Sequence, residues 1–318
     1  MSKIPCYVGI DVSKATFNTY YNGIDGKYGN NLKGFQRLLK EVPSGAIFTM
    51  ESTGNFHYRL AAYLCRNNCL VRVFNPLYVK RWIQSLGNKA KTDKIDAMYI
   101  ASYSATDKAQ IDYWQPLPPK HQRARTIVSL LSGLSRLERS AGNMRYSATL
   151  VANKMDNMLN SMSSVKSICR EQQENLENEL CSIVGEIFPK QFHLLQTIPS
   201  IGGKTAAVLL VLCKGLEPFE THKQLTSYVG LDTRIHESGI IKGKGKISKT
   251  GNGYLRGLLF MCAFGSVRLN TPMRSMYRRL LAKGNDKMLA LTAVSHRILK
   301  IAFGVVRSGR PYRGIALA

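Results

Sequence analysis

Two carboxylates stand three residues apart in the segment 91–97, which reads KTDKIDA and opens an apolar stretch of helix-favouring residues. Side chains with this spacing share one face of a helix, so Asp93 and Asp96 repel each other unless a cation or a proton lies between them. Acids near a helix N-terminus also have an ordinary explanation, because the helix dipole favours negative charge there. The pair alone is therefore compatible with a solvated helix start or with a cation site.

Two more acids stand at the ends of predicted strands. Asp11 lies near the end of YVGIDV at 7–12, and Glu51 directly follows the apolar run 46–50. Open sheets form their sites at strand ends, so we expect these two acids to meet the acidic helix. Carboxylate oxygens favour Mg²⁺ or Mn²⁺ over zinc, and a pair of such ions stabilises both oxygens of a phosphodiester displacement. The predicted Mg²⁺ ligands, with Mn²⁺ as the alternative metal, are Asp11, Glu51, Asp93 and Asp96.

A serine lies in the unusual segment 239–253, which reads GIIKGKGKISKTGNG. Its glycines permit close approach to a backbone, and its lysines attract an anionic polymer. Serine needs activation before it acts as a nucleophile, and a group of cations is one means of lowering its pKa. The residues alone leave three roles open for Ser248: nucleophile, helix cap and phosphate hydrogen-bond donor. The cations predicted to bind nucleic acid here are Lys242, Lys244, Lys246, Lys249 and Arg256.

The acids must be positioned by the first part of the chain. Its pattern predicts three antiparallel strands, a helix, a strand, a helix, a strand and further helices, with NG at 22–23 and DG at 25–26 as turns. This is the order of a ribonuclease H-like mixed sheet with right-handed crossovers. The segment 9–14, GIDVSK, also resembles the phosphate strand of actin-like kinases. Those proteins require a second glycine-rich phosphate loop, which we do not find in place.

The rest of the chain is predicted to be mainly helical. Residues 120–154 are basic and carry an apolar stripe, which we expect to pack on the sheet. On the opposite side of this helix, Arg123 and Arg125 are expected to contact a phosphate backbone. Residues 156–190 carry apolar residues at spacings of three and four, with Gln172 in the seam. This pattern fits a coiled coil formed within the chain or between two chains, and equally an amphipathic helix that packs on the chain's own core.

The segment 194–206 predicts a helix, a Pro/Gly turn and a second helix starting at Lys204. This helix-hairpin-helix pattern binds a phosphate through turn amides and a helix N-terminus without reading bases. The dipeptide at 203–204 with Thr205 imitates a P-loop, but that motif requires glycine at position 198, which is isoleucine.

The net charge differs between three parts of the chain. The net charge of +25 splits into +13 for 1–155, −3 for 156–190 and +15 for 191–318. Such a surplus points to a polyanion, with nucleic acid ahead of an anionic membrane. The seven cysteines are scattered without zinc spacing, which favours reduced thiols. With no signal-like N-terminus and no long uncharged apolar run, we expect a soluble, cytoplasmic protein that does not enter a membrane.

The motifs jointly resemble one family across nearly the whole chain. They are GIDVSK at 9–14, ESTG at 51–54, NP at 75–76, KTDKIDA at 91–97, IPSIG at 198–202, GL at 230–231 and ISKTGN at 247–252, followed by Leu255 and Arg256. In this order they are similar to the DEDD transposases of the "one-ten" insertion-sequence family. Each motif alone is weak, while the joint pattern is specific. The hairpin turn departs from the Gly-Pro or Pro-Gly common in the family.

The resemblance implies a RuvC-like catalytic domain at 1–155, a coiled-coil linker at 156–190 and a transposase domain at 191–318. It implies that Asp11, Glu51, Asp93 and Asp96 are the DEDD metal ligands and that Ser248 attacks DNA to form a phosphoserine intermediate. It further implies a bacterial or archaeal protein that acts on double-stranded donor and target DNA with a structured guide RNA, as a dimer or tetramer. In that assembly, the acids of one protomer act with the serine of another.

We therefore expect an RNA-guided, Mg²⁺-dependent DNA transposase or recombinase. Two other functions fit parts of the pattern. A RuvC-like junction-resolving nuclease would use metal-activated water and no serine, and a nucleic-acid scaffold would need neither set of residues.

Overall fold

The computed structural model of the 318-residue chain describes residues 6–52, 54–87, 93–106, 113–151, 156–234, 237–238, 241–242, 246–269 and 271–314. The chain forms two compact units, residues 1–117 and 118–318. The predicted first boundary at 155 falls inside the second unit, because the long helix after Pro118 packs on helices of that unit.

The first unit is built on a five-stranded mixed sheet in the order β3-β2-β1-β4-β5. The strands β1 (Tyr7–Val12), β2 (Thr16–Tyr21) and β3 (Ile24–Gly29) form an antiparallel meander, while β4 (Ile47–Glu51) and β5 (Leu70–Phe74) run parallel to β1. This is the order predicted for a ribonuclease H-like sheet. The helices of this unit are α1 (Leu32–Glu41), α2 (Tyr58–Arg66), α3 (Pro76–Ser85) and α4 (Asp93–Thr106).

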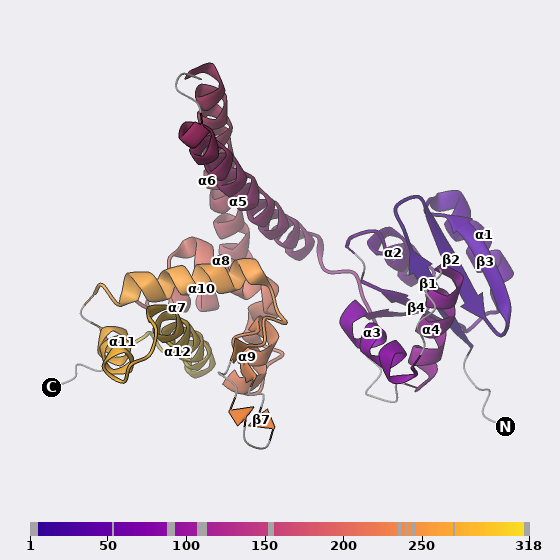
Figure 1. Ribbon diagram of the computed structural model, residues 1–318. Helices are drawn as coiled ribbons and strands as arrows, with labels where there is room; N and C mark the ends of the chain where they lie inside the picture. The colour runs from indigo at the N-terminus through magenta and orange to yellow at the C-terminus, as the bar shows by residue number, and fades with distance from the viewer. Residues whose placement is uncertain are drawn as a thin grey trace. The chain divides into compact units, whose positions relative to one another are not determined.

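Helices cover both faces of the sheet (Figure 1). One face buries Ile10 and Met50 with Leu38 of α1 and Leu60 of α2. The other face receives α4, and the contact is tightest at Gly9, where a Cβ atom would lie 2.0 Å from the carbonyl oxygen of Ala97. Glycine is needed there because the helix backbone lies directly on the strand.

Polar contacts also attach α4 to the sheet. Arg72 of β5 is buried, and its Nη1 donates to the backbone oxygen and the Oγ of Ser104, both at 3.1 Å. Phe74 meets Tyr103 edge-on with ring centroids 4.9 Å apart. The side chains at alternate positions of β5 thus point to the α4 face, which identifies the face on which the acids must lie.

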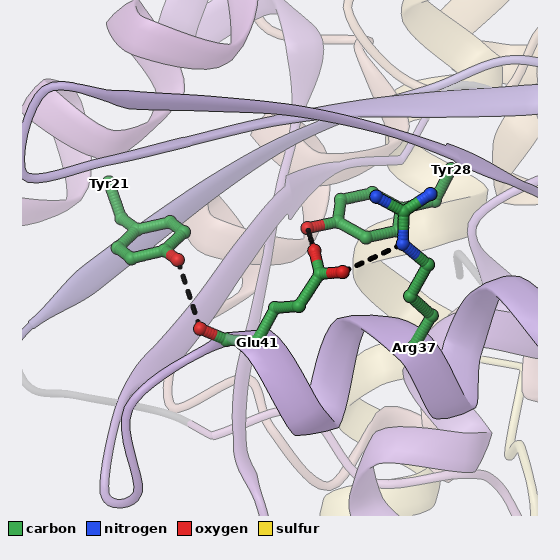
Figure 2. Close-up of polar contacts among 4 residues, drawn as sticks. All are labelled: Tyr21, Tyr28, Arg37 and Glu41. Atoms are coloured by element: carbon green, nitrogen blue, oxygen red, sulfur yellow. Dashed lines mark hydrogen bonds and ion pairs between the residues drawn. The ribbon is translucent and has the colours of Figure 1, made fainter.

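The end of α1 is held against the hairpin by one carboxylate (Figure 2). Glu41 accepts hydrogen bonds from Arg37 Nε and from the Tyr28 hydroxyl, both at 2.7 Å, and its backbone oxygen accepts one from Tyr21 at 3.1 Å. The bond from Arg37 is the main cause of the lowered Glu41 pKa. Burial, followed by the bond to Glu41, raises the pKa of Tyr28 to about 12.

The second unit begins with two long helices, α5 (Pro119–Val151) and α6 (Asp156–Ile187), which lie side by side (Figure 1). The apolar stripe of α5, expected to pack on the sheet, is instead partly buried within the second unit. Ile127 and Leu131 are buried with residues of α6 and α8, whereas Leu137 is 58% exposed. Leu180 and Val184 of α6 are buried in the same core as Ile127 and Leu131, so α6 packs on its own chain, and the coiled coil stays a prediction.

One position of the seam differs from the prediction. Gln172 is exposed, and Gln173 is buried, accepting from Ser135 Oγ and donating to Glu138, both at 3.2 Å. A polar residue in the seam is fixed by partners on the facing helix, which periodicity alone does not locate.

The remaining helices form the core of the second unit. They are α7 (Pro189–Gln196), α8 (Gly203–Leu212), the 3₁₀ turn η1 (Lys214–Leu216), α9 (His222–Val229), α10 (Gly253–Ser266), α11 (Pro272–Ala282) and α12 (Lys287–Ser308). Two short antiparallel ladders join β6 (Thr233–Arg234) to β9 (Lys246–Ile247) and β7 (Glu237–Ser238) to β8 (Ile241–Lys242). The predicted hairpin appears as α7, a turn with Ser200 at φ +69°, and α8.

The helix α12 is long and apolar enough to cross a membrane by length and composition. Its apolar residues include Val294, Ile298 and Ala302, all fully buried in the core of the second unit. All seven cysteines are free thiols, and Cys213 is buried so deeply that its pKa rises to about 12.

Candidate functional site

The structure places two of the predicted metal ligands on adjacent strands. In the parallel pair β1 and β4, Ile10 lies opposite Met50, so the next positions, Asp11 and Glu51, are neighbours on the same side of the sheet. That side is the α4 face, because Asp11 follows Gly9 by two residues. Both acids are partly buried.

The third acid comes from α4 itself. Asp96 is partly buried and directly precedes Ala97, whose backbone touches Gly9. The backbone of Asp93 begins α4, whereas its side chain and residues 88–92 lie outside the described part of the structure. Among the side chains that are described, no three Asp, Glu, His or Cys residues form a group able to hold a metal ion. The strand register thus brings Asp11 beside Glu51, and the four-acid site stays a prediction.

The predicted nucleophile has an acidic partner that the sequence reasoning missed. The Ser248 hydroxyl donates a short hydrogen bond to Oδ1 of Asp232, and the Ser248 amide donates to the Asp232 carbonyl at 2.9 Å. The ladder explains the pairing: Thr233 of β6 lies opposite Ile247 of β9, so Asp232 and Ser248 are the next cross-strand pair. Side chains at directly opposed positions lie on the same face.

The C-terminal end of α9 holds the serine segment in place. Gly230 ends α9 with φ +78°, and its carbonyl accepts from the Lys249 amide at 3.1 Å. A Cβ on Gly251 would lie 2.1 Å from the Tyr228 carbonyl oxygen, so the two backbones are in direct contact. Arg256 joins them, since its Nη1 donates to Val229 at 3.0 Å and to Gly251 at 2.7 Å.

These contacts exclude one role considered for Ser248, the helix cap, and they replace the cations expected to activate it with an acid. Ser248 is not the cap of α10, because Asn252 caps that helix by accepting from the amides of Tyr254 and Leu255. The Ser248 hydroxyl bonds an acid and lies 3.1 Å from Thr250 Oγ1, rather than bonding a described lysine or Arg256. Asp232 could have been suspected only from its position directly after the GL pair at 230–231, because neither its residue type nor its distance from Ser248 in the sequence indicates a role.

The cations predicted to bind nucleic acid differ in exposure and in their contacts. Lys204 and Arg123 form ion pairs with α6, to Glu177 at 3.0 Å and Glu179 at 2.5 Å. Arg125, Lys246 and Lys249 are exposed, Lys249 in the left-handed region at φ +56°. Lys242 lies in β8 with its side chain outside the described residues, and Lys244 lies outside them altogether.

Comparison with known proteins gives two family matches. Residues 8–162 match the family "DEDD_Tnp_IS110: Transposase", and residues 192–278 match "Transposase IS116/IS110/IS902 family". The first match includes Asp11, Glu51, Asp93 and Asp96, and the second includes Asp232 and Ser248.

Relatives cover almost the whole chain. A "Pilin gene-inverting protein" from Moraxella bovis is 30% identical over 96% of this chain and 97% of its own length. A "Probable family 20 transposase" from Pseudomonas aeruginosa is 24% identical over 96% of this chain and 98% of its own length. The transposase of element IS1111A from Coxiella burnetii is 23% identical over 96% of this chain and 91% of its own length. The chain therefore belongs to the IS116/IS110/IS902 family of transposases.

Proposed function

We propose that this transposase recombines DNA at specific sites through a covalent bond between Ser248 and a DNA phosphate, assisted by a metal-binding acidic site on the first unit. The observation that carries the proposal is the Ser248 hydroxyl, held on a backbone frame and hydrogen-bonded to a carboxylate. A serine whose proton has an acceptor in place has the arrangement expected of a nucleophile. The full-length relatives that are named as gene-inverting proteins and transposases support the same class of reaction.

The acids fit a divalent metal by their chemistry and register. Asp11 and Glu51 are neighbours on the α4 face, and Asp96 lies in the first turn of α4, the helix that packs on that face. Their carboxylates are the hard oxygen donors that Mg²⁺ or Mn²⁺ prefers. Asp93, one turn earlier, would complete the set. A bound metal would supply charge stabilisation to the phosphate.

The proposal has three partners: duplex donor and target DNA, a structured guide RNA, and further copies of the chain. The net charge of +25 supports binding to nucleic acid. The guide RNA and the dimeric or tetrameric assembly rest on the resemblance described above. Sequencing the RNA that co-purifies with the chain tests the guide. A single structured RNA encoded beside the gene supports it, and a random sample of cellular RNA contradicts it.

The covalent step is tested by trapping the adduct. The chain is expressed from a plasmid that retains the natural DNA flanking its gene, cells are lysed in denaturant, and protein–DNA adducts are digested with nuclease. We expect mass spectrometry to find a nucleotide remnant on Ser248, and Ser248→Ala to lose the adduct. An adduct that persists in Ser248→Ala would show that another residue is the nucleophile, and activity without any adduct would replace this proposal with the water-using nuclease.

The acidic site has its own test and control. Asp11→Asn is expected to abolish strand cleavage while duplex binding persists. The control is Asp25→Asn, which removes an exposed acid from β3 of the same sheet and is expected to leave cleavage unchanged. Equal cleavage by both variants would contradict the metal site, and unchanged behaviour of Asp11→Asn and Ser248→Ala together would favour a scaffold.

A further inference from the structure

We propose that Asp232 is the general base of the serine reaction: it takes the proton of Ser248 as the hydroxyl attacks the DNA phosphate. The inference rests on the proposed nucleophilic role of Ser248. It adds a residue from the same unit as the serine and assigns the proton to a named atom, Asp232 Oδ1.

The first support is the direction of the hydrogen bond. A serine hydroxyl has one proton, and in this structure that proton points to the Asp232 carboxylate. A general base must lie within hydrogen-bond reach of the proton that it removes, and Asp232 meets this condition before any substrate is bound. Aspartate accepts a hydroxyl proton in the phosphoryl transfer of protein kinases, so the chemistry suits a phosphodiester substrate.

The second support is the surrounding network. Thr250 Oγ1 donates to the Ser227 carbonyl oxygen at 3.3 Å and lies 3.1 Å from Ser248 Oγ. Because Ser248 gives its proton to Asp232, a bond between the two hydroxyls requires the single Thr250 proton to turn from Ser227 to Ser248. That rotation would give the serine oxygen a donor for its developing negative charge while Asp232 accepts its proton.

The third support is rigidity. Asp232 and Ser248 are joined by a backbone bond of 2.9 Å, and the chain on either side is fixed to the end of α9 through Gly230 and Arg256. Because backbone contacts already hold the segment, the side-chain bond between Ser248 and Asp232 is not needed to fix it. A base held in place in this way avoids the cost of ordering it during the reaction.

The step balances as a transesterification. A bond forms between Ser248 Oγ and phosphorus while one bond from phosphorus to a deoxyribose oxygen breaks, and Asp232 receives the serine proton. The leaving oxygen becomes a hydroxyl by taking a proton from water. When a DNA hydroxyl later displaces the serine, that hydroxyl gives its proton to water and the Asp232 carboxyl group returns a proton to Ser248, so both halves use one residue.

The test compares Asp232→Asn with the wild-type chain in the adduct assay. Asparagine has nearly the same shape and its amide oxygen still accepts from Ser248, but it is not a base. We expect adduct formation to slow by about 10²- to 10⁴-fold, the usual contribution of a general base, with duplex affinity unchanged. Asp232→Glu, which keeps the carboxylate, is expected to recover part of the rate.

A matched control separates charge from chemistry. Asp286→Asn also removes one negative charge from the second unit, at an exposed position that begins α12 without a side-chain cap bond. It is expected to form the adduct at the wild-type rate. A wild-type rate in Asp232→Asn would overturn the inference while leaving the nucleophile intact, whereas an adduct in Ser248→Ala would overturn the nucleophile itself.

Discussion

Tyr28 shows how a single side chain links the stability of the first unit to pH. Its hydroxyl donates to Glu41 in a buried position, and its pKa rises from 10.0 to about 12. Because the folded state holds this proton more tightly than the unfolded chain, the contribution to stability is complete below pH 10 and is lost as pH rises toward 12.

Tyr28→Phe is therefore expected to destabilise the first unit below pH 10, and its difference from wild type is expected to shrink between pH 10 and 12. Urea unfolding followed by tryptophan fluorescence reports on this unit alone, because Trp82 and Trp114 both belong to it. Tyr78→Phe, at an exposed tyrosine of α3, is the control and should show no such pH dependence. A gap between Tyr28→Phe and wild type that stays constant with pH would contradict the assignment.

Residue types indicated several of the candidate site residues, but they did not indicate Asp232. Asp11, Glu51 and Ser248 stand out because acids at strand ends and a serine among glycines and lysines are uncommon. Asp232 does not, because its role depends on a ladder that places it opposite a residue sixteen positions away. Gln173 makes the same point: helical spacing predicted a polar seam residue but placed it one position early, since the partners on α5 decide which glutamine is buried.

The backbones of two elements in the first unit, β1 and α4, are in direct contact. Gly9 leaves no space for a side chain, as a Cβ would meet Ala97 and Ala101 at 2.0–2.9 Å. The position of Asp96 over the sheet depends on this contact. The order of the elements was predictable from the sequence because hydrophobic periodicity is a local signal. The surface on which the apolar stripe of α5 packs was not predictable, because such a stripe can pack on any apolar surface.

Gly9→Ala is expected to lower the free energy of unfolding of the first unit by at least about 1–3 kcal/mol, the usual cost of overpacking. The closest atoms belong to the helix backbone and cannot rotate away, so α4 itself must move. DNA cleavage should fall along with the tryptophan unfolding midpoint.

The control for this change is Gly133→Ala on α5, where nothing lies within 4 Å of the added Cβ. Alanine is favoured over glycine inside a helix, so this variant is expected to leave the tryptophan signal unchanged and to stabilise α5 by up to about 1 kcal/mol. A Gly9→Ala protein with the wild-type midpoint would show that α4 does not pack on β1 as described.

Across the whole chain, the positive charge is partly balanced by α6. Three acids of α6 form ion pairs with cations of α5 and α8, joining Glu186 to Lys120, Glu179 to Arg123 and Glu177 to Lys204. A fourth pair has the opposite sense and joins Arg170 of α6 to Glu138 of α5. Exposed pairs of this kind contribute only about 0–1 kcal/mol, so a DNA phosphate can replace a carboxylate as the partner of an arginine. We therefore expect the acidic segment to lower the affinity of the basic helix for nucleic acid without removing its cations.

Glu179→Gln is accordingly expected to raise the affinity for a short duplex of mixed sequence by up to about fivefold. In this variant Arg123 does not have to break an ion pair with Glu179 before it binds a DNA phosphate. Glu171→Gln removes the same charge from an exposed position of α6 and should raise affinity less. Arg123→Gln should reduce the slope of log affinity against log salt by about 0.9, the release of one counterion. Fluorescence anisotropy at several salt concentrations measures all three variants. Equal affinities of the two glutamate variants, together with an unchanged slope in Arg123→Gln, would show that Arg123 does not contact the duplex and that only the overall charge of the chain attracts it.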